Sequence, residues 1–106
     1  MTAKEKERLA AEAGVIKTLA HPTRLLMVHA VARMPRCVRD LATITGADIT
    51  TVSKHLSILR AAGIVSSTKR RQQVFYSLNC PCVLEFIRCV SKVMASVTRD
   101  RMRLLQ

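Results

Sequence analysis

The sequence predicts a mainly α-helical domain with one small β-hairpin, and three observations support this fold class. Apolar residues recur at spacings of three and four over most of the 106 residues, as they do on one face of a helix. Residues 64–78 depart from that period. There is no Trp and only one Tyr and two Phe, so the core must come from aliphatic side chains. A chain of this length is the size of one domain, residues 1–106.

Two helices are expected before residue 36. The apolar period predicts the first over residues 3–20. Pro22 suits the first turn of the second helix, because its ring fixes a helical φ and its missing N–H would have no partner there. This helix continues to about Arg33, and Pro35 ends it by favouring an extended conformation in the preceding residue.

Residues 38–62 have the dimensions of a helix-turn-helix. A short helix is expected over residues 38–45, followed by Gly46, which tolerates the left-handed conformation at a helix C-terminus. Asp48 can cap the second helix, because its carboxylate can accept hydrogen bonds from free N–H groups of the first turn.

Residues 64–78 predict the β-hairpin, because β-prone pairs flank the cationic segment 69–73. The helical period then returns and predicts a last helix over residues 80–104. The order of elements, ααααββα, is that of a winged helix-turn-helix in which the hairpin is the wing.

The last helix carries an apolar stripe that is too wide for a helix exposed to water on all sides. We expect the stripe to pack against the first and last helices of a second copy, which would make the protein a homodimer. Dimerisation would also enlarge the core of so short a chain. The stripe consists of Val83, Phe86, Ile87, Val90, Val93, Met94 and Val97.

The charge of the chain predicts a polyanionic partner. Eighteen Lys and Arg against seven Asp and Glu give a formal net charge of +11, which favours nucleic acid or an anionic membrane surface. No apolar run approaches the ~20 residues of a membrane span, and the charged N-terminal segment lacks the apolar stretch of a signal peptide. We therefore expect a cytoplasmic protein whose four cysteines are thiols, metal ligands or redox sensors rather than structural disulfides.

Double-stranded DNA is the expected partner. The second helix of the helix-turn-helix offers short hydroxyl groups and a cation, which can contact phosphates and base edges, and the hairpin tip adds three cations that can reach phosphates or a minor groove. Each of these residues would also suit an ordinary solvated surface. A two-fold dimer predicts a palindromic operator. The candidate DNA contacts are Thr50, Thr51, Ser53, Lys54, His55 and Ser57 on the helix and Lys69, Arg70 and Arg71 at the tip.

Two runs of residues resemble the arsenic- and metallothionein-repressor (ArsR/SmtB) family of bacterial regulators. They are residues 19–25, LAHPTRL, and residues 52–65, VSKHLSILRAAGIV. The resemblance implies a dimeric winged helix that represses transcription by occupying its operator and releases it when an inducer binds. Ile49 stands where many relatives carry a polar residue, so the operator sequence does not transfer from them.

Three of the four cysteines are candidate ligands of that inducer. Cys37 lies in a segment similar to the Cys-Val-Cys-Asp-Leu-Cys box of arsenic-responsive relatives, in which Arg39 and Ala42 replace the other two cysteines. Cys80 and Cys82 stand at the start of the last helix, where the positive end of the helix dipole favours a thiolate. The resemblance implies a short strand at Cys37 beside the second strand of the wing, which would bring the three thiolates together.

A site of three thiolates suits trivalent arsenic or antimony, As(III) or Sb(III), as the inducer. Zinc prefers four ligands, and the last helix offers no His. A second interpretation is a persulfide or redox sensor that joins Cys37 to Cys80 or Cys82 through sulfur. A third is that the cysteines are small buried residues with no sensory role.

The remaining thiol and two of the histidines are expected to be structural. Cys89 has the helical phase of the apolar stripe and is expected to be a core thiol. His21 and His29 are expected to be imidazoles whose hydrogen bonds are satisfied within the domain.

Two classes of function therefore remain open. One is a ligand-responsive transcriptional repressor, and the other is a constitutive DNA-binding module without an inducer. An enzyme is not expected, because the sequence lacks a recognisable set of nucleophile and base and lacks a phosphate-binding loop. A membrane-binding role is disfavoured, since the apolar stripe is better used in a dimer.

Overall fold

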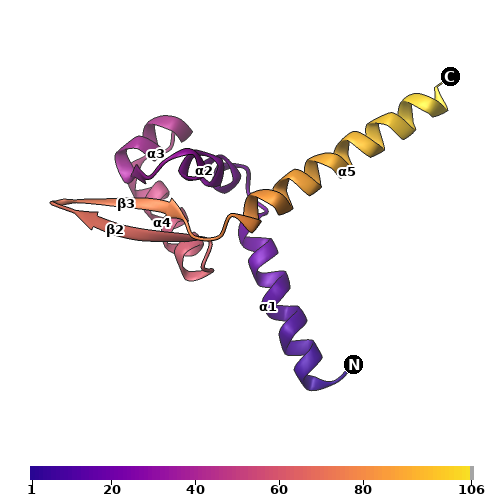
Figure 1. Cartoon of the computed structure of the whole chain (residues 1–106), viewed down its shortest axis with the longest axis horizontal. Helices are drawn as coiled ribbons and strands as arrows, with labels where there is room; N and C mark the ends of the chain where they lie inside the picture. The colour runs from indigo at the N-terminus through magenta and orange to yellow at the C-terminus, as the bar shows by residue number, and fades with distance from the viewer. Residues whose placement is uncertain (106) are drawn as a thin grey trace.

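The computed structural model describes residues 1–105 and places five helices and three strands in them. The winged helix-turn-helix expected from the sequence is confirmed (Figure 1). No helix within residues 1–105 combines the length and the apolar character needed to span a bilayer. In chain order the elements are α1 (Ala3–Leu19), α2 (Pro22–Arg33), β1 (Arg36–Cys37), α3 (Val38–Thr45), α4 (Ile49–Ala61), β2 (Val65–Arg70), β3 (Gln73–Leu78) and α5 (Cys82–Leu104).

The first helix begins with a capping box. The backbone N–H of Glu5 donates to Thr2 Oγ1 at 3.1 Å, and the backbone N–H of Thr2 donates to Glu5 Oε2 at 3.0 Å. The second helix begins at Pro22, and His21 caps it by accepting a hydrogen bond from the N–H of Thr23 at 3.1 Å. The expected structural role of His21 is thereby confirmed.

The turn of the helix-turn-helix has the chemistry that the sequence indicates. Gly46 ends α3 with a φ of 74°, a left-handed conformation that costs glycine little because it has no Cβ. Asp48 then caps α4, since its Oδ1 accepts a hydrogen bond from the N–H of Thr51 at 2.7 Å. These two residues set the directions of α3 and α4.

The buried core lies almost entirely in the central unit, which we define as residues 22–78. Helices α2, α3 and α4 pack around it, and the first residues of the hairpin close it. Leu19 is the single contribution from α1, and no residue of α5 within the described chain is buried. The largest fully buried side chains are Met27, Val28, Leu41, Val52, Leu56, Leu59 and Ile64.

The three strands form one antiparallel sheet in the order β1-β3-β2. The hairpin pairs Val65 with Leu78 at its base and Arg70 with Gln73 at its tip. The short strand β1 lies against the middle of β3, where Cys37 is opposite Phe75.

Helix α5 begins at Cys82, two residues later than the start at Cys80 that the sequence suggests. The reason is a tight turn before it: the N–H of Val83 donates to the carbonyl of Cys80 at 3.2 Å, and that of Leu84 to Pro81 at 3.1 Å. Pro81 therefore occupies the N-cap of α5.

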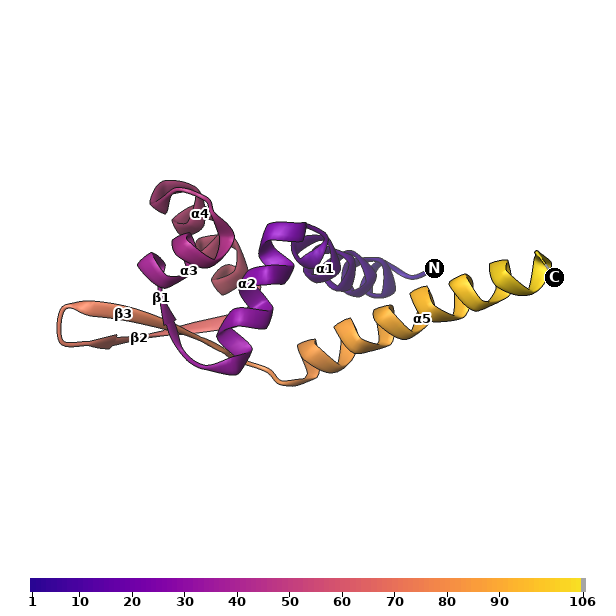
Figure 2. The same cartoon turned by 90° about the horizontal axis from the view of Figure 1, so that it is seen from above.

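Helices α1 and α5 project from the central unit on the side opposite the hairpin (Figures 1 and 2). The radius of gyration is 16.8 Å, against about 13 Å for a compact chain of this length. The two helices, which we call the arms, thus find few partners within their own chain.

Candidate nucleic-acid interface and cysteine site

Helix α4 presents one buried and one exposed face. Val52, Leu56 and Leu59 are buried in the core. The opposite face forms a shallow hollow that combines hydroxyl groups, one ammonium group and two isoleucines. The residues that line it are Ile49, Thr50, Ser53, Lys54, Ser57 and Ile58. Thr51 is also exposed.

Ile49 and Ile58 extend this face beyond the residues expected from the sequence. Their side chains are 54 % and 40 % exposed. The signal that could have found them is helical phase, since Ile58 follows Lys54 by four residues and lies on the same side of the helix. Apolar side chains at such positions can contact the methyl group of thymine in a major groove.

The tip of the wing is cationic and exposed. Lys69 and Arg70 end β2, and Arg71 occupies the turn with a φ of 58°. The guanidinium of Arg70 lies over the ring of Phe75, 6.0 Å from the ring centroid, a geometry that allows a cation–π interaction. Within residues 1–105 the ion pairs are Arg8–Glu12 and Glu85–Arg88, so the tip cations are free to meet an external anion.

His55 lies apart from the hollow on the exposed face of α4, so its expected contact with DNA stays a prediction. Its Nδ1 accepts a hydrogen bond from Nε of Arg24 at 3.0 Å, and its ring meets the edge of the His21 ring at 4.7 Å between centroids. Its side chain is therefore turned towards α2. Burial lowers the pKa of His55, and the neighbouring His21 and Arg24 lower it further.

Asp48 is the acidic group closest to this face in sequence. The hydrogen bond from the N–H of Thr51 is the main reason that the pKa of its carboxyl lies below the usual value of 3.8. The negative charge is thus held at the N-terminus of α4, where the helix dipole favours it.

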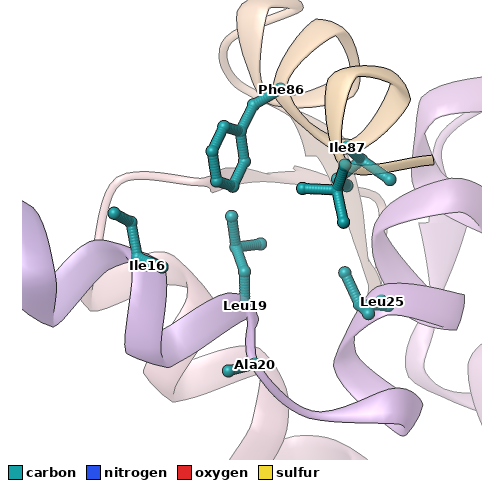
Figure 3. Close-up of a pocket in the computed structure, with 7 residues that line it drawn as sticks. Ile16, Leu19, Ala20, Leu25, Phe86 and Ile87 are labelled. Atoms are coloured by element: carbon teal, nitrogen blue, oxygen red, sulfur yellow. The ribbon is translucent and has the colours of Figure 1, made fainter. Parts of the chain in front are cut away.

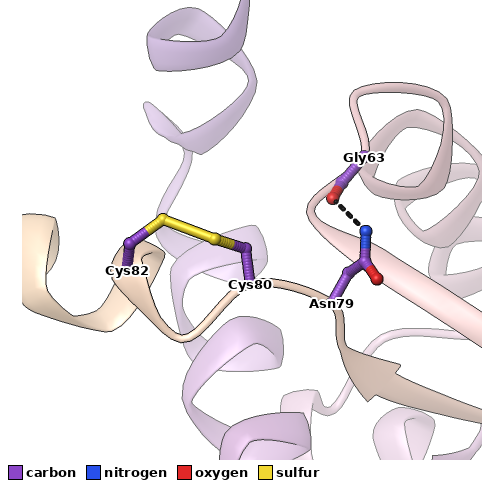
Figure 4. The surroundings of a disulfide bond; sticks show 4 residues. All are labelled: Gly63, Asn79, Cys80 and Cys82. Carbon is purple, nitrogen blue, oxygen red and sulfur yellow. Dashed lines mark hydrogen bonds between the residues drawn. A yellow bond between two sulfur atoms is a disulfide. The ribbon is translucent and has the colours of Figure 1, made fainter.

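A disulfide joins Cys80, in the turn after β3, to Cys82, the first residue of α5, with their Cα atoms 5.4 Å apart (Figure 4). The turn is anchored to the end of the helix-turn-helix by Asn79. The side-chain Nδ2 of Asn79 donates to the carbonyl of Gly63 at 3.1 Å, and its backbone N–H donates to Ile64 at 2.9 Å. The cysteine pair therefore sits at the joint between the central unit and the α5 arm.

Cys37 does not join this pair, which overturns the three-thiolate site within one chain. Phe75, its partner in the sheet, stands three residues or ~10 Å before Leu78, at which β3 ends, and Cys80 lies beyond that end. The strand at Cys37 was expected correctly, but its register with β3 places the thiol towards the wing. No group of three His, Cys, Asp or Glu side chains in residues 1–105 could hold a metal ion. The disulfide also joins Cys80 to Cys82, rather than either of them to Cys37.

The structure exposes two side chains, those of Cys89 and His29, that were expected to be enclosed by the domain. Cys89 is exposed rather than a core thiol, because no residue of α5 within the described chain is buried. His29 is exposed on α2, so its imidazole is not enclosed by the domain.

An apolar notch lies where the arms meet α2 (Figure 3). We define the notch by its lining residues, which come from α1, α2 and α5. Cys82 lies in the wall of an adjoining hollow that shares Ile16, Leu19 and Phe86 with it. The notch is lined by Ile16, Leu19, Ala20, Leu25, Phe86, Ile87 and Val90.

Comparison with known proteins places the chain in a family. Residues 21–67 match the family model described as "Bacterial regulatory protein, arsR family". The uncharacterized HTH-type transcriptional regulator Rv0081 of Mycobacterium tuberculosis is 31 % identical over 96 residues, which are 90 % of this chain and 84 % of that protein. The biofilm growth-associated repressor of Xylella fastidiosa is 37 % identical over 79 residues, 74 % of this chain and 69 % of that protein.

A solved structure with the same fold is the homodimeric winged helix-turn-helix DNA-binding domain Mb0332 of Mycobacterium bovis, a possible ArsR-family regulator. Its TM-score is 0.81 at 26 % identity, with 94 % of this chain and 93 % of that chain covered. The fold and the relatives are those of DNA-binding transcriptional regulators and not of enzymes. The chain belongs to the arsR family of bacterial regulatory proteins, and it is a DNA-binding transcriptional regulator.

Proposed function

We propose that this protein is a homodimeric, cytoplasmic transcriptional repressor that occupies a palindromic DNA operator. The observation that carries the proposal is the exposed face of α4 beside the unpaired cations of the wing. Hydroxyl groups and Lys54 on that face would meet base edges and phosphates in a major groove, and Arg70 and Arg71 would reach the neighbouring backbone.

The apolar notch supports the dimer. Its lining side chains include Phe86 and Val90, which are 41 % and 45 % exposed, and exposed apolar patches on a soluble chain mark interaction sites. A second copy related by a two-fold axis would cover both notches at once. The two α4 helices would then face two half-sites of a palindrome about one turn of DNA apart.

The test begins with selection of binding sequences from a pool of random duplexes by the full-length, reduced protein. We expect enrichment of a palindrome bound by two chains, measured by sequencing and by sedimentation of the complex. Lys54→Gln and Arg70→Gln should weaken binding to the selected duplex. A variant that has lost one phosphate contact should also show a salt slope lower by about one.

Lys92→Gln is the matched control, because it removes the same charge from the exposed surface of α5. It should leave affinity and salt slope close to those of the wild type. Selection of no sequence motif would contradict the proposed operator, and selection of an asymmetric site bound by one chain would contradict the dimer.

Thiol chemistry at Cys80 and Cys82 is the proposed control of release, and their proximity supports it. As(III) or Sb(III) would bind the reduced pair as two of its three sulfur ligands, while a persulfide or another two-electron oxidant would join the two thiols as a disulfide. Cys82 also faces the hollow beside the notch, so a change at the pair would alter the fit of the arms. The two reading helices would then no longer match the operator.

Titration of the protein–operator complex tests this control. Arsenite, antimonite, zinc, cadmium and a persulfide donor are added separately to the reduced protein, and release is followed by fluorescence anisotropy. We expect release by arsenite, or by the persulfide donor with a mass change that locates a link between Cys80 and Cys82. Cys80→Ser should abolish the response, and Cys89→Ser should retain it.

Release by none of these reagents would leave a constitutive DNA-binding module. A response that survives Cys80→Ser but is lost with Cys37→Ser would move the sensor to the other thiol.

A further inference from the structure

Arg24 bridges three helices. From the first turn of α2, its Nη1 donates to the carbonyl of Thr18 at the end of α1, at 3.2 Å. Its Nε donates to Nδ1 of His55 on α4, at 3.0 Å. One planar guanidinium thus connects the α1 arm to the helix that carries the DNA-contacting face, and all three residues are partly buried.

The corner between α1 and α2 holds this bridge in place. The N–H of His21 donates to the carbonyl of Leu19 at 2.8 Å, and the N–H of Leu25 donates to the carbonyl of His21 at 3.0 Å. The His21 ring is fixed by its own hydrogen bond from Thr23 and meets the His55 ring edge-on. Arg24 and His21 therefore hold His55 from two directions.

The hydrogen bond fixes the protonation state of His55. A guanidinium has donors only, so Nδ1 of His55 must carry a lone pair, and the ring must be neutral with its proton on Nε2. Protonation of Nδ1 would remove the acceptor and place a second cation against Arg24. Among the described residues, the charged or titratable groups that act on His55 are His21 and Arg24, and both lower its pKa together with burial.

We propose that Arg24 and His55 are positioning residues for operator recognition. They set the angle of α4 relative to the α1 arm, and through the arms of the dimer they set the separation of the two DNA-contacting faces. The proposal rests on the proposed dimer and palindromic operator. It also predicts sensitivity to pH, because the bridge requires neutral His55.

The sign of the pH effect follows from the lowered pKa. A histidine that is bridged when the three helices are held together and free when the bridge opens binds protons more readily in the open form. The bridge is therefore complete above the ordinary histidine pKa of 6.5 and weakens as the pH falls below that value. Without the bridge effect, a lower pH would add positive charge and strengthen DNA binding.

The experiment compares operators that differ only in the spacing of their half-sites. The selected palindrome is rebuilt with one or two base pairs added to or removed from its centre, and the affinity of each duplex is measured between pH 5.5 and 8. Wild-type protein should bind the original spacing at least tenfold more tightly than the others, since each disrupted base contact weakens binding by roughly that factor. This preference should shrink as the pH falls below 6.5.

Arg24→Lys keeps the charge but replaces the planar two-sided donor by a single ammonium group. In this variant the affinities for the different half-site spacings should lie within about threefold of one another, and the variant should stay dimeric. The reason is that the loss of the bridge changes the placement of α4 and not the individual contacts with DNA. His55→Asn provides an amide oxygen near the place of Nδ1 that cannot titrate. It should keep the spacing preference and lose its pH dependence.

His29→Asn is the control, because it removes an exposed imidazole of α2 outside the bridge. It should behave as the wild type at every pH. Thermal unfolding of each variant separates folding from positioning: a uniform loss of affinity at all spacings, with a lowered Tm, would show a structural role only and overturn the proposal. An unchanged spacing preference in Arg24→Lys, or an unchanged pH dependence in His55→Asn, would overturn it as well.

The failures of the two proposals are distinguishable. If wild-type protein selects no palindrome, the proposed function fails. If it selects a palindrome and the variants share its spacing preference, the positioning proposal alone fails.

Discussion

The central unit and the arms of this protein differ in how far their apolar side chains are covered by the rest of the chain. Within residues 22–78, apolar side chains of three helices and a hairpin cover one another, and seven of them are fully buried. Helix α5 is longer than any helix of the central unit, yet none of its described residues is buried. The core of the central unit takes Leu19 from α1 and is contacted by the first turns of α5, whereas most of the apolar side chains further along α5 are exposed.

The contrast explains how one short chain can combine rigidity with adjustability. A DNA-contacting helix must keep its shape, and α4 is anchored by Val52, Leu56 and Leu59 in the core. In the proposed dimer, the separation between two such helices would depend on the arms, which join the central unit through the α1–α2 corner and the Asn79 turn. Small changes at these two joints would move whole binding faces without unfolding either one.

The largest expected effect comes from the core. Leu56→Ala should lower the free energy of unfolding by about 2–5 kcal/mol, because the residue is fully buried and leaves a cavity. Ile58→Ala on the same helix is the control, and it should change stability far less because the side chain is partly exposed. Urea unfolding at one protein concentration measures both, and equal losses would refute the division of α4 into a core face and a free face.

The next effect tests the arms. Val90→Glu places a carboxylate in the notch and should raise the dimer dissociation constant by about 30-fold or more, the loss typical of a central interface residue. Sedimentation at several concentrations measures it, and circular dichroism should show that the helices remain. Lys92→Gln changes the charge by the same amount and should leave the dimer intact. A dimer that tolerates Val90→Glu would show that the notch is not its interface.

Two glycine-to-alanine substitutions test whether the central unit and the α1 arm unfold together. Gly46→Ala should cost about 1–2 kcal/mol, because its φ of 74° disfavours any Cβ. Gly14→Ala in the middle of α1 should instead stabilise the protein by about 0.5–1 kcal/mol. Neither new methyl group meets an atom within 4 Å, so the two changes report on the backbone alone. No gain from Gly14→Ala in thermal unfolding would mean that the arm melts before the central unit.

The smallest expected effect is a change in the stability of the protein at low pH. The pKa of Asp48 is lowered in the folded protein, so its contribution to stability is present above 3.8 and is lost as the pH falls below that value. Asp48→Asn keeps a capping oxygen without the charge, and its stability should fall less steeply than that of the wild type over this range. Asp100→Asn in α5 serves as the control. Urea unfolding at pH 3 and pH 5 measures the stability of the three proteins. An equal loss of stability in all three between pH 5 and pH 3 would refute the stabilising role of the Asp48 charge.

The helices, the turn and the hairpin were predictable because each is encoded locally. Gly46 predicts a helix end because glycine tolerates the left-handed conformation, and Asp48 predicts a helix start because its carboxylate can cap one. The change of apolar period predicts the wing. Helical phase also located the exposed hydroxyl groups of α4.

What escaped prediction depends on contacts between distant residues. The position of Cys37 depends on its register with β3, and a shift of a few residues along a strand moves a thiol by ~10 Å. The hydrogen bond between His55 and Arg24 was not predicted, because a helical position does not reveal a partner 31 residues earlier. Cys89 was assigned to a core because its stripe is apolar, but phase cannot tell whether the covering surface belongs to the same chain.

The uncovered notch also has a consequence for dosage. If operator binding requires two chains and free chains are mostly monomeric, the concentration of dimer rises with the square of the monomer concentration. Doubling the amount of protein would then raise the dimer about fourfold. Occupancy of the operator would change steeply with the rate of synthesis. The uncovered apolar notch of a single chain would in this way make repression depend steeply on the concentration of the repressor.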